Sequence, residues 1–523
     1  MPGVNAVNHG LGVIVRAANL VLGMSAGLCF GLFLLMVSRH GWSWHYVLFL
    51  ALAGILAGSL RLPGHIRVNL TLVVCSLVVC CYLAEAVLAL NPVSQQLSMF
   101  GASWLPKAFG DNAGAEKMQA EFARQQHVEF DTRSRLSVIK DLRQAGRDAW
   151  PNVPATALYK DGPPGVSLSA ITIEGASAMP LGGIANKLTV FCNENGAYTI
   201  YDTDEHGFHN PRGLWATSGQ SIAAVGDSFA QGACVPTDKN FVALLRQRYP
   251  KTVNVGRGGN GPLSELASIK EYLSIVKPPM VFWFYFEEND LQEDLPREER
   301  DPILRKYLTA GFSQGLIGKQ AAIDRALMDH INAAQKSQGF IGRIWSNLSE
   351  PRSVQTVFEQ LEYRVKLTSL RETVTRLVRQ GSGEPGEHDL QVHPPVPEET
   401  INLFRNVLEE AQRSIQAWGG TMVFVYLPQW ERYVDVQYAS KDRDAVLTLA
   451  RSLELPIIDM HLAFAAHPDP VSLFPFRWRG HYTEEGHRMV AEELIRFSSR
   501  QPGMPPADAA GLEPVGAGGP GGQ

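Results

Sequence analysis

The chain has 523 residues, of which 19% are charged, and its formal net charge at pH 7 is −5. The sequence has no block of Lys and Arg that could neutralise a row of phosphates, so nucleic acid is not an expected partner. The length allows several compact units with at least one large hydrophobic core. The first part of the chain is far more apolar than the rest, which predicts a membrane-associated part followed by a water-soluble part.

Three apolar segments lie in this first part, at residues 17–38, 42–60 and 68–90. A helix that crosses a bilayer needs about 20 mostly apolar residues, so each segment is long enough to span. A cleaved signal peptide is the alternative for the first segment. Signal peptides have a shorter apolar region, however, and two more apolar segments follow directly. We therefore expect residues 1–92 to form a membrane anchor of three transmembrane helices, with the lipid bilayer as a partner.

The positive charges in the short loops predict the orientation of this anchor. Arg16 precedes the first segment, and Arg61 and Arg67 lie between the second and third, so these residues share one side of the membrane. Arg39 and the more distant Lys107 belong to the other side. The larger group predicts a cytoplasmic N-terminus, with everything after residue 90 outside the cytoplasm.

The cysteines fall into two groups. Four lie within the apolar segments, where they pack as small apolar residues: Cys29, Cys75, Cys80 and Cys81. Only Cys192 and Cys234 lie in the water-soluble part, and no CxxC-type spacing accompanies them, so we expect no metal site. A pair of cysteines in an oxidising compartment predicts a disulfide, and two unrelated buried thiols are the alternative.

Residues 93–185 have the pattern of a stalk or linker. They contain an amphipathic helical stretch around 114–147 and then a Pro/Gly-rich passage at 151–165. Two segments within 187–204 alternate like strands, and Asn-Glu-Asn-Gly between them is a turn signal.

Five short apolar runs then have the character of buried parallel strands: 221–226, 252–256, 280–286, 421–427 and 455–460. Helical segments separate these runs, and this alternation predicts an α/β fold with a parallel sheet and helices on both faces. We expect this domain to span residues 186–500, with a largely helical insertion at about 295–400. The Pro-, Gly- and Ala-rich tail at 501–523 is expected to be disordered.

Polar residues follow several of these runs. Gly226-Asp227-Ser228 follows the first run, residues 256–261 follow the second, residues 287–290 follow the third, and residues 480–483 lie beyond the last. Taken alone, such a Ser is usually a helix N-cap, a glycine-rich turn only permits positive φ, and most histidines are structural. Ligands of an open parallel sheet bind at the carboxyl ends of its strands. Together these motifs therefore predict one site at that edge.

This set of motifs resembles the SGNH/GDSL hydrolase superfamily over roughly residues 185–300 and 415–497. The stretch GDSF at 226–229 resembles the first block, and NVGRGGNG at 254–261 resembles the second. FYFEEND at 284–290 resembles the third block, and GHYTEEGH at 480–487 resembles the last. The resemblance implies a flavodoxin-like α/β domain.

A further stretch, DTDEHGFHNP at 202–211, resembles the lead-in of the superfamily's saccharide-modifying bacterial branch. The resemblance implies that Ser228 is the nucleophile and that His481 takes its proton and later donates one to the leaving alcohol. Gly259 and Asn289 would complete an oxyanion hole, in which the loss of one donor typically costs ~100- to 1,000-fold in turnover. This chemistry needs no cofactor.

One position departs from the superfamily's pattern, which has an Asp three residues before the catalytic His. Trp478 stands there in this chain, and its neighbours Arg477 and Arg479 have the wrong charge. Two alternatives follow. The Trp478 main-chain carbonyl holds the imidazole in a Ser-His dyad, which we expect, or an acid from elsewhere does so, such as Asp469 or Asp459.

The function expected from these features is that of a membrane-anchored, extracytoplasmic serine esterase of the SGNH/GDSL type. Its expected location is the bacterial inner membrane, with several spans and a periplasmic catalytic domain. Its expected substrate is an ester-linked acyl group, in particular the O-acetyl group of a saccharide. One alternative is an O-acyltransferase of an exported polysaccharide, and the other is a catalytically decayed glycan-binding or scaffold protein beside the polysaccharide export machinery.

Overall fold

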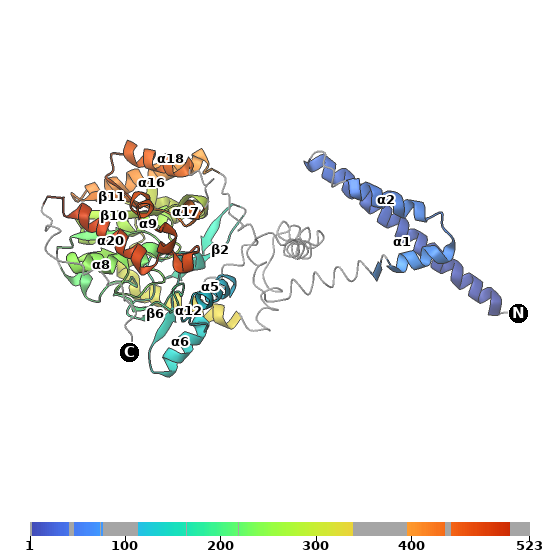
Figure 1. Ribbon diagram of the computed structural model, residues 1–523, viewed down its shortest axis with the longest axis horizontal. Helices are drawn as coiled ribbons and strands as arrows, with labels where there is room; N and C mark the ends of the chain where they lie inside the picture. The colour runs from blue at the N-terminus through green and yellow to red at the C-terminus, as the bar shows by residue number, and fades with distance from the viewer. Residues whose placement is uncertain are drawn as a thin grey trace. The chain divides into compact units, whose positions relative to one another are not determined.

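A computed structural model describes residues 3–40, 47–73, 75–76, 113–163, 165–217, 219–337, 395–434 and 441–502 (Figure 1). The chain divides into two compact units, one of residues 1–96 with 351–386 and one of residues 97–350 with 387–523. We describe each unit by itself.

The N-terminal unit is built on α1 (Gly3–His40) and α2 (Val47–Ser59), which pack together through Leu22, Ala26 and Leu56. Within α1, Ile14–Gly31 has a mean hydropathy of 1.5, and only 17% of this window is buried. By length and composition α1 can cross a membrane, and it is the one helix of the described residues that meets both criteria.

The described residues support one span instead of the three predicted. The second predicted segment, 42–60, contains α2, whose 13 residues are about 20 Å long and fall short of the ~30 Å hydrocarbon core. Pro63 follows shortly after the end of α2 and cannot continue a helix without losing a hydrogen bond. The third predicted segment, 68–90, lies outside the described residues from residue 77 onward.

The main sheet of the second unit has five strands in the order β12-β11-β10-β8-β9, all of them parallel. The strands are β8 (Ile222–Val225), β9 (Thr252–Asn254), β10 (Met280–Phe286), β11 (Thr421–Leu427) and β12 (Ile457–Asp459). Each of the five predicted runs forms one of these strands. Their order is the flavodoxin-like order, which confirms the predicted α/β fold.

Both faces of this sheet are buried, which explains why its strands read as continuous apolar runs. On β10, Val281, Trp283 and Tyr285 belong to one hydrophobic core, whereas Phe282 and Phe284 belong to the other. This alternation follows from the two-residue period of a strand.

Helices cover the two faces (Figure 1). One face carries α9 (Pro262–Ser268), α16 (Glu398–Gln416) and α18 (Lys441–Ser452), and the other carries α8 (Phe241–Arg248), α19 (Met460–Ala465) and α20 (Glu484–Ser498). Other helices of this unit are α5 (Ala113–Gln125), α6 (Arg135–Gln144), α7 (Ser228–Gln231), α10 (Ser274–Val276), α11 (Leu295–Glu299) and α17 (Glu431–Val434). Of the predicted insertion, α12 (Gln320–Ser337) packs Ile323, Leu327 and Ile331 into the first core. Residues 338–394 lie outside the described residues.

A second, smaller sheet has the order β1-β6-β7 and is formed by β1 (Ala149–Pro151), β6 (Leu188–Val190) and β7 (Ile200–Asp202). Strands β6 and β7 pair antiparallel, as the alternating segments at 187–204 predicted. Two short hairpins lie between β1 and β6, namely β2 (Tyr159–Asp161) with β3 (Ser167–Ser169) and β4 (Thr172–Ile173) with β5 (Ala176–Ser177).

Residues 149–185, which the sequence assigned to the stalk, belong to the core of this unit. Val153, Leu158 and Ile171 are buried in the first hydrophobic core. The Pro/Gly-rich passage carries apolar side chains that need to be buried, and the loop after β9 supplies hydrogen-bond partners for its backbone. The first part of the predicted stalk, up to residue 112, and the predicted tail from residue 503 lie outside the described residues.

Candidate active site

Ser228 lies at the carboxyl edge of the main sheet, where β8 turns into α7. Asp227 caps this helix by accepting a hydrogen bond of 2.9 Å from the Phe229 amide. Gly226 is needed in the turn, because a Cβ there would lie 2.9 Å from the Ala230 Cβ. The strand order reverses at β8, and this is the point of a doubly wound sheet where ligands bind.

His481 faces Ser228 across this edge. Its Nε2 lies 2.7 Å from the Ser228 Oγ, which is hydrogen-bonding distance for a nucleophile and its base. The Phe229 ring lies against the imidazole, with the ring centroids 4.8 Å apart. Ser228 and His481, both predicted from the sequence, are therefore brought together.

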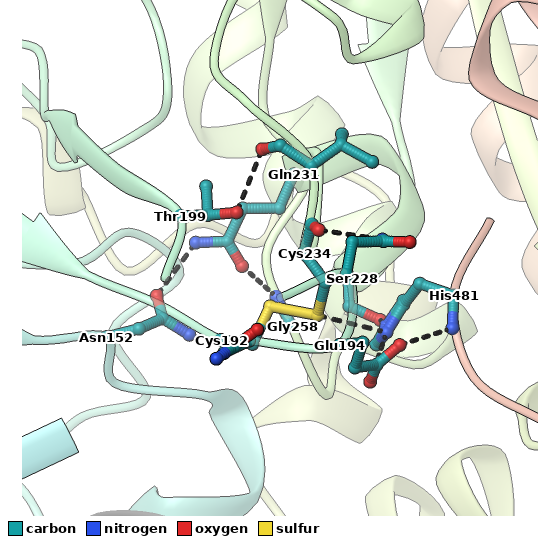
Figure 2. Close-up of a disulfide and its surroundings, with 12 residues drawn as sticks. Asn152, Cys192, Glu194, Thr199, Ser228, Gln231, Cys234, Gly258 and His481 are labelled. Atoms are coloured by element: carbon teal, nitrogen blue, oxygen red, sulfur yellow. Dashed lines mark hydrogen bonds and ion pairs between the residues drawn. A yellow bond between two sulfur atoms is a disulfide. The ribbon is translucent and has the colours of Figure 1, made fainter. Parts of the chain in front are cut away.

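The acid that orients the imidazole is Glu194 (Figure 2). Its Oε1 lies 2.9 Å from the His481 Nδ1, and its Oε2 accepts a hydrogen bond of 2.7 Å from the His481 backbone amide. Glu194 lies on the loop between β6 and β7, so the acid and the nucleophile come from different sheets. The three residues form a Ser–His–Glu triad.

The structure thus contradicts the predicted Ser–His dyad and its alternatives. Asp469 forms an ion pair with Arg477, and Asp459 forms one with Arg443, so neither carboxylate faces the imidazole. The Trp478 ring packs against Phe122, at 5.4 Å between ring centroids. Within the described residues the Trp478 carbonyl makes no hydrogen bond to the imidazole, because Glu194 occupies the Nδ1 side.

The triad is largely buried, with 22% of the His481 side chain and 18% of the Glu194 side chain exposed. Burial alone would lower the pKa of His481, but the charge and hydrogen bond of Glu194 outweigh it, so the pKa is raised above 6.5. Burial likewise acts to raise the pKa of Glu194, yet the nearby imidazole lowers it overall. The pair therefore favours an ionised Glu194 beside a basic His481.

Gly259 and Asn289 lie on the two sides of Ser228. Gly259 follows β9 and Asn289 follows β10, and these strands flank β8 in the sheet. Asn289 stands at the head of a π-helical turn, η6 (Asp290–Asp294), and its side-chain Oδ1 is buried without a hydrogen-bond partner among the described residues. Both residues occupy the edge at which the predicted oxyanion hole would form.

Gln231, which the sequence analysis did not single out, fixes the loop after β9. Its Oε1 accepts a hydrogen bond of 2.6 Å from the Gly258 amide (Figure 2). Its Nε2 donates to the Asn152 Oδ1 at 2.8 Å and to the Tyr201 hydroxyl at 2.6 Å. Because Gln231 is on α7, one side chain ties the nucleophile's helix to the glycine loop and to the smaller sheet.

The segment after β1 lies directly against the same loop. The Ala155 amide donates to the Gly258 carbonyl at 2.8 Å. Gly259 has a φ of +76°, and a Cβ at this position would lie 3.0 Å from the Thr156 Cγ2. The buried Arg257 donates to the carbonyl of Val153 at 2.8 Å. Arg257 and Gly258 of the glycine loop are thus held by hydrogen bonds to Val153 and Ala155, which lie in the segment that the sequence analysis assigned to the stalk.

Cys192 and Cys234 form a disulfide beside the triad (Figure 2). The Cys234 Sγ lies 3.6 Å from the His481 Nδ1. Ligand atoms of Glu194, Cys234 and His481 all lie within 4.8 Å of one another, which is a spacing that a metal ion would accept. The Cys234 sulfur is bonded to Cys192, however, so it offers no thiolate ligand in this state.

The lead-in stretch at 202–211 supports the edge of the main sheet. Asp204 accepts hydrogen bonds from the Asn210 side chain at 2.7 Å and from the Trp215 ring at 2.6 Å. The Asn210 side chain in turn pairs with the backbone of Asn254, at 2.8 Å to both its amide and its carbonyl. The motif thus holds β9, whose following loop carries Gly259.

A group of buried carboxyl groups includes Asp227, the residue before Ser228, and others that interact with it electrostatically. They are Asp227, Glu265, Asp290, Asp294 and Glu298, each of them at most 2% exposed. Burial, together with their mutual repulsion, raises the pKa of Glu265 and of Asp290 well above the ordinary values. Burial also raises the pKa of Asp227 to about 6.

Comparison with known proteins finds no matching family model and no matching curated protein. Among solved structures, a lipase/acylhydrolase from Enterococcus faecalis matches at 11% identity and a TM-score of 0.28, over 53% of this chain and 94% of its own. A member of the lipolytic protein G-D-S-L family from Veillonella parvula matches at 11% identity and a TM-score of 0.27, over 54% of this chain and 99% of its own.

The psychrotrophic esterase EstA from a Pseudoalteromonas species matches at 9% identity and a TM-score of 0.25, over 53% of this chain and 95% of its own. This chain is thus similar, over about half of its length, to solved structures of G-D-S-L lipolytic proteins, acylhydrolases and esterases.

Proposed function

We infer that this protein is a serine esterase that hydrolyses ester-linked acyl groups through an acyl-enzyme intermediate. The observation that carries this proposal is the continuous hydrogen-bonded row from the Ser228 Oγ through His481 to Glu194, with distances of 2.7 Å and 2.9 Å. A nucleophile, its base and an orienting acid are the three parts that such chemistry needs.

In the proposed reaction, the Ser228 Oγ attacks the ester carbonyl while the His481 Nε2 accepts the hydroxyl proton. The Glu194 carboxylate stabilises the imidazolium that forms and keeps its ring in place. The negative oxygen of the tetrahedral intermediate would face the amides of Ser228 and Gly259 and the side chain of Asn289. His481 then gives its proton to the leaving alcohol, and water resolves the acyl-enzyme by the same route.

The test is to measure hydrolysis of 4-nitrophenyl acetate by the full-length protein in detergent. We expect Ser228→Ala to lower kcat by at least about 10⁴-fold, as loss of a triad nucleophile does elsewhere. A serine-reactive fluorophosphonate should label the unaltered protein and leave Ser228→Ala unlabelled. Equal turnover by the two proteins would reject Ser228 as the nucleophile.

The proposal extends to a membrane-anchored enzyme with its active site outside the cytoplasm. The apolar window Ile14–Gly31 supports an anchor, although a signal sequence has the same position and composition. The Cys192–Cys234 disulfide supports an oxidising compartment. N-terminal sequencing of the protein recovered from membranes tests this extension, since a chain that starts after residue 31 would indicate a cleaved signal.

For the substrate we propose an O-acetylated saccharide, on the strength of the lead-in motif at 202–211. Mass spectrometry of surface polysaccharide acetylation, with the active protein and with Ser228→Ala, tests this choice. Greater acetylation in the Ser228→Ala cells would support an esterase, and lower acetylation would support an acyltransferase, because both reactions share the acyl-enzyme. The contact of 2.9 Å between the Glu194 Oε1 and the His481 Nδ1 supports an active enzyme over the decayed-site alternative, which started from a missing acid.

A further inference from the structure

The disulfide and the catalytic acid share one short loop. Cys192 follows β6, and only Asn193 separates it from Glu194. At the other end of the bond, Cys234 lies shortly after α7, the helix that begins with Ser228. The disulfide therefore joins the loop of the acid to the loop of the nucleophile, between two sheets that make no strand pairing with each other.

The loop that carries Glu194 is also joined to its surroundings by hydrogen bonds, and the Thr199 Oγ1 donates to the Val235 carbonyl after α7 at 2.8 Å. The Asn195 side chain donates to the Cys234 carbonyl at 2.9 Å. The Asn193 side chain donates to the Asp131 carbonyl at 3.0 Å and accepts from the Gly196 amide at 2.9 Å. The bonds of Asn193 order the loop, whereas those of Asn195 and Thr199, together with the covalent bond, join it to the segment after α7. Glu194 depends on that connection, because both of its oxygens contact His481.

We propose that the Cys192–Cys234 disulfide positions Glu194 against His481, so that esterase activity depends on the oxidation state of this bond. The inference rests on the proposed function and names a regulation of the same site. On reduction, the loop that carries Glu194 keeps its hydrogen bonds but loses its covalent link to Cys234. The reduced protein would then hold Glu194 less firmly against His481 and react more slowly.

The chemistry of the switch balances with a phosphine as the reductant. The phosphine gives two electrons to the S–S bond, and water supplies the two protons of the thiols and the oxygen of the phosphine oxide. A phosphine is preferable to dithiothreitol in the assay, because a thiol would itself attack 4-nitrophenyl acetate. After removal of the phosphine, dioxygen takes the two electrons and two protons of the thiols and becomes hydrogen peroxide, which restores the bond and should restore the rate.

The effect of the bond on the reaction can be separated from its effect on stability by a double-mutant cycle. The cycle compares Cys192→Ser/Cys234→Ser, Glu194→Gln, and the combination of both, each as full-length protein in detergent. If the disulfide acts through Glu194, its removal should cost roughly 10- to 100-fold in kcat/KM when Glu194 is present, which is part of the ~10⁴-fold that loss of a triad acid costs. In the Glu194→Gln background the same removal should cost less than about threefold.

The pH dependence of kcat/KM provides a second readout, which would not change if the disulfide only stabilised the fold. Besides Glu194, the carboxyl groups of Asp227 and Glu288 face His481 and raise its pKa, and these two groups are unchanged in all variants. Because reduction would place a titratable Cys234 thiol 3.6 Å from the His481 Nδ1, the profile is measured on Cys192→Ser/Cys234→Ser. In this variant the acidic limb of kcat/KM should shift to lower pH, in the direction that Glu194→Gln shifts it. Cys29→Ser, which replaces a free cysteine of α1, should change neither the rate nor the limb.

Two outcomes would overturn the inference. One is unchanged activity in Cys192→Ser/Cys234→Ser or in the phosphine-reduced protein, with reduction verified by alkylation and mass spectrometry. The other is an equal loss of kcat/KM on removal of the disulfide in the presence and absence of Glu194. That result would show that the disulfide acts through α7 and not through Glu194. If the double variant fails to fold, the reduced protein and reduced Glu194→Gln complete the same cycle. Absence of Ser228-dependent turnover in the oxidised protein would instead reject the proposed function itself.

Discussion

Glu194 reaches His481 with both carboxylate oxygens, one on the ring and one on the backbone amide. The second contact matters because it fixes the main chain of the residue whose ring must turn toward Ser228. A single side chain thus sets both the position and the charge of the imidazole. An acid three residues before the His would be kept near it by the intervening backbone. Glu194 is distant from His481 in the sequence and is kept near it by the fold.

We expect Glu194→Gln to lower kcat by about 10²- to 10⁴-fold, because Gln keeps the shape but loses the charge that stabilises the imidazolium. The protonated imidazole cannot accept the Ser228 proton, so kcat/KM decreases at pH values below the pKa of His481. Glu194 raises that pKa, and its replacement should move the acidic limb of the pH profile to lower pH.

Asp469→Asn is the matched control for this prediction. Asp469 is exposed and paired with Arg477, so its charge should not contribute to turnover. A collapse of activity in Asp469→Asn, with Glu194→Gln unaffected, would show that the triad has been assigned to the wrong acid.

The residues on the main sheet could be predicted from the sequence because each follows a recognisable strand. Ser228, Gly259 and Asn289 stand at the ends of apolar runs, and their runs are neighbours in the sheet. Glu194 could not be predicted in this way, because it lies in a turn of a separate sheet. A signal was nevertheless present: pairing Cys192 with Cys234 places the residues after Cys192 beside the loop that follows Ser228.

At the scale of elements, the glycine loop after β9 depends on parts of the chain that surround it. The hydrogen bonds of Gln231 and Ala155 hold Gly258 from two directions. A Cβ at Gly259 would lie 3.0 Å from the Thr156 Cγ2, so Thr156 would have to move slightly to admit a side chain there. The stalk prediction failed here because a Pro/Gly-rich passage reads as a linker, whereas its burial depends on partners distant in the sequence.

We expect Gly259→Ala to lower kcat by about 100- to 1,000-fold, which is the typical cost of losing one oxyanion donor. The added methyl would strain a backbone at φ +76° and press on Thr156, and the amide would turn away. The measurement is hydrolysis of 4-nitrophenyl acetate, together with the midpoint of thermal unfolding.

Gly146→Ala controls for backbone strain alone. Gly146 has a φ of +77°, but no atom lies within 4 Å of a Cβ built there. The Gly146→Ala variant should have a slightly lower midpoint of thermal unfolding and unchanged hydrolysis of 4-nitrophenyl acetate. If Gly259→Ala retained full turnover, Gly259 would have no part in stabilising the intermediate.

Across the whole second unit, the apolar core encloses a group of acids that water would otherwise solvate. Glu265 is fully buried, and neither of its carboxylate oxygens has a hydrogen-bond partner among the described residues. A buried carboxyl in such surroundings keeps its proton, because the charged form is the costly one. The sequence shows these acids but gives no sign that they share one interior.

We expect the free energy of unfolding to fall as the pH rises above about 7 toward the raised pKa of each such group, by up to ~1.4 kcal/mol per pH unit for each group. The raised pKa of Glu265 means that the folded state holds a proton which the unfolded chain has already lost. Burial lowers the pKa of His209 to about 4 and that of His487 to about 3, so both are neutral in either state here and contribute nothing.

Thermal unfolding followed at several pH values checks this expectation, and Glu265→Gln provides the comparison. This variant removes the titrating group with little change of shape, so its stability should depend less on pH and should exceed that of the unaltered protein at high pH. A slope that stays the same in Glu265→Gln would contradict the assignment of this group.

The order in which the triad appears along the chain has a consequence for a protein made from its N-terminus onward. Residues 149–185 and Glu194 emerge before the glycine loop that they surround, and Ser228 emerges well before His481. The acid and the nucleophile are therefore present on the growing chain while the base is still unmade. Under the proposed function, turnover therefore requires synthesis through His481, and an unfinished chain that ends before it has Ser228 and Glu194 but lacks the base.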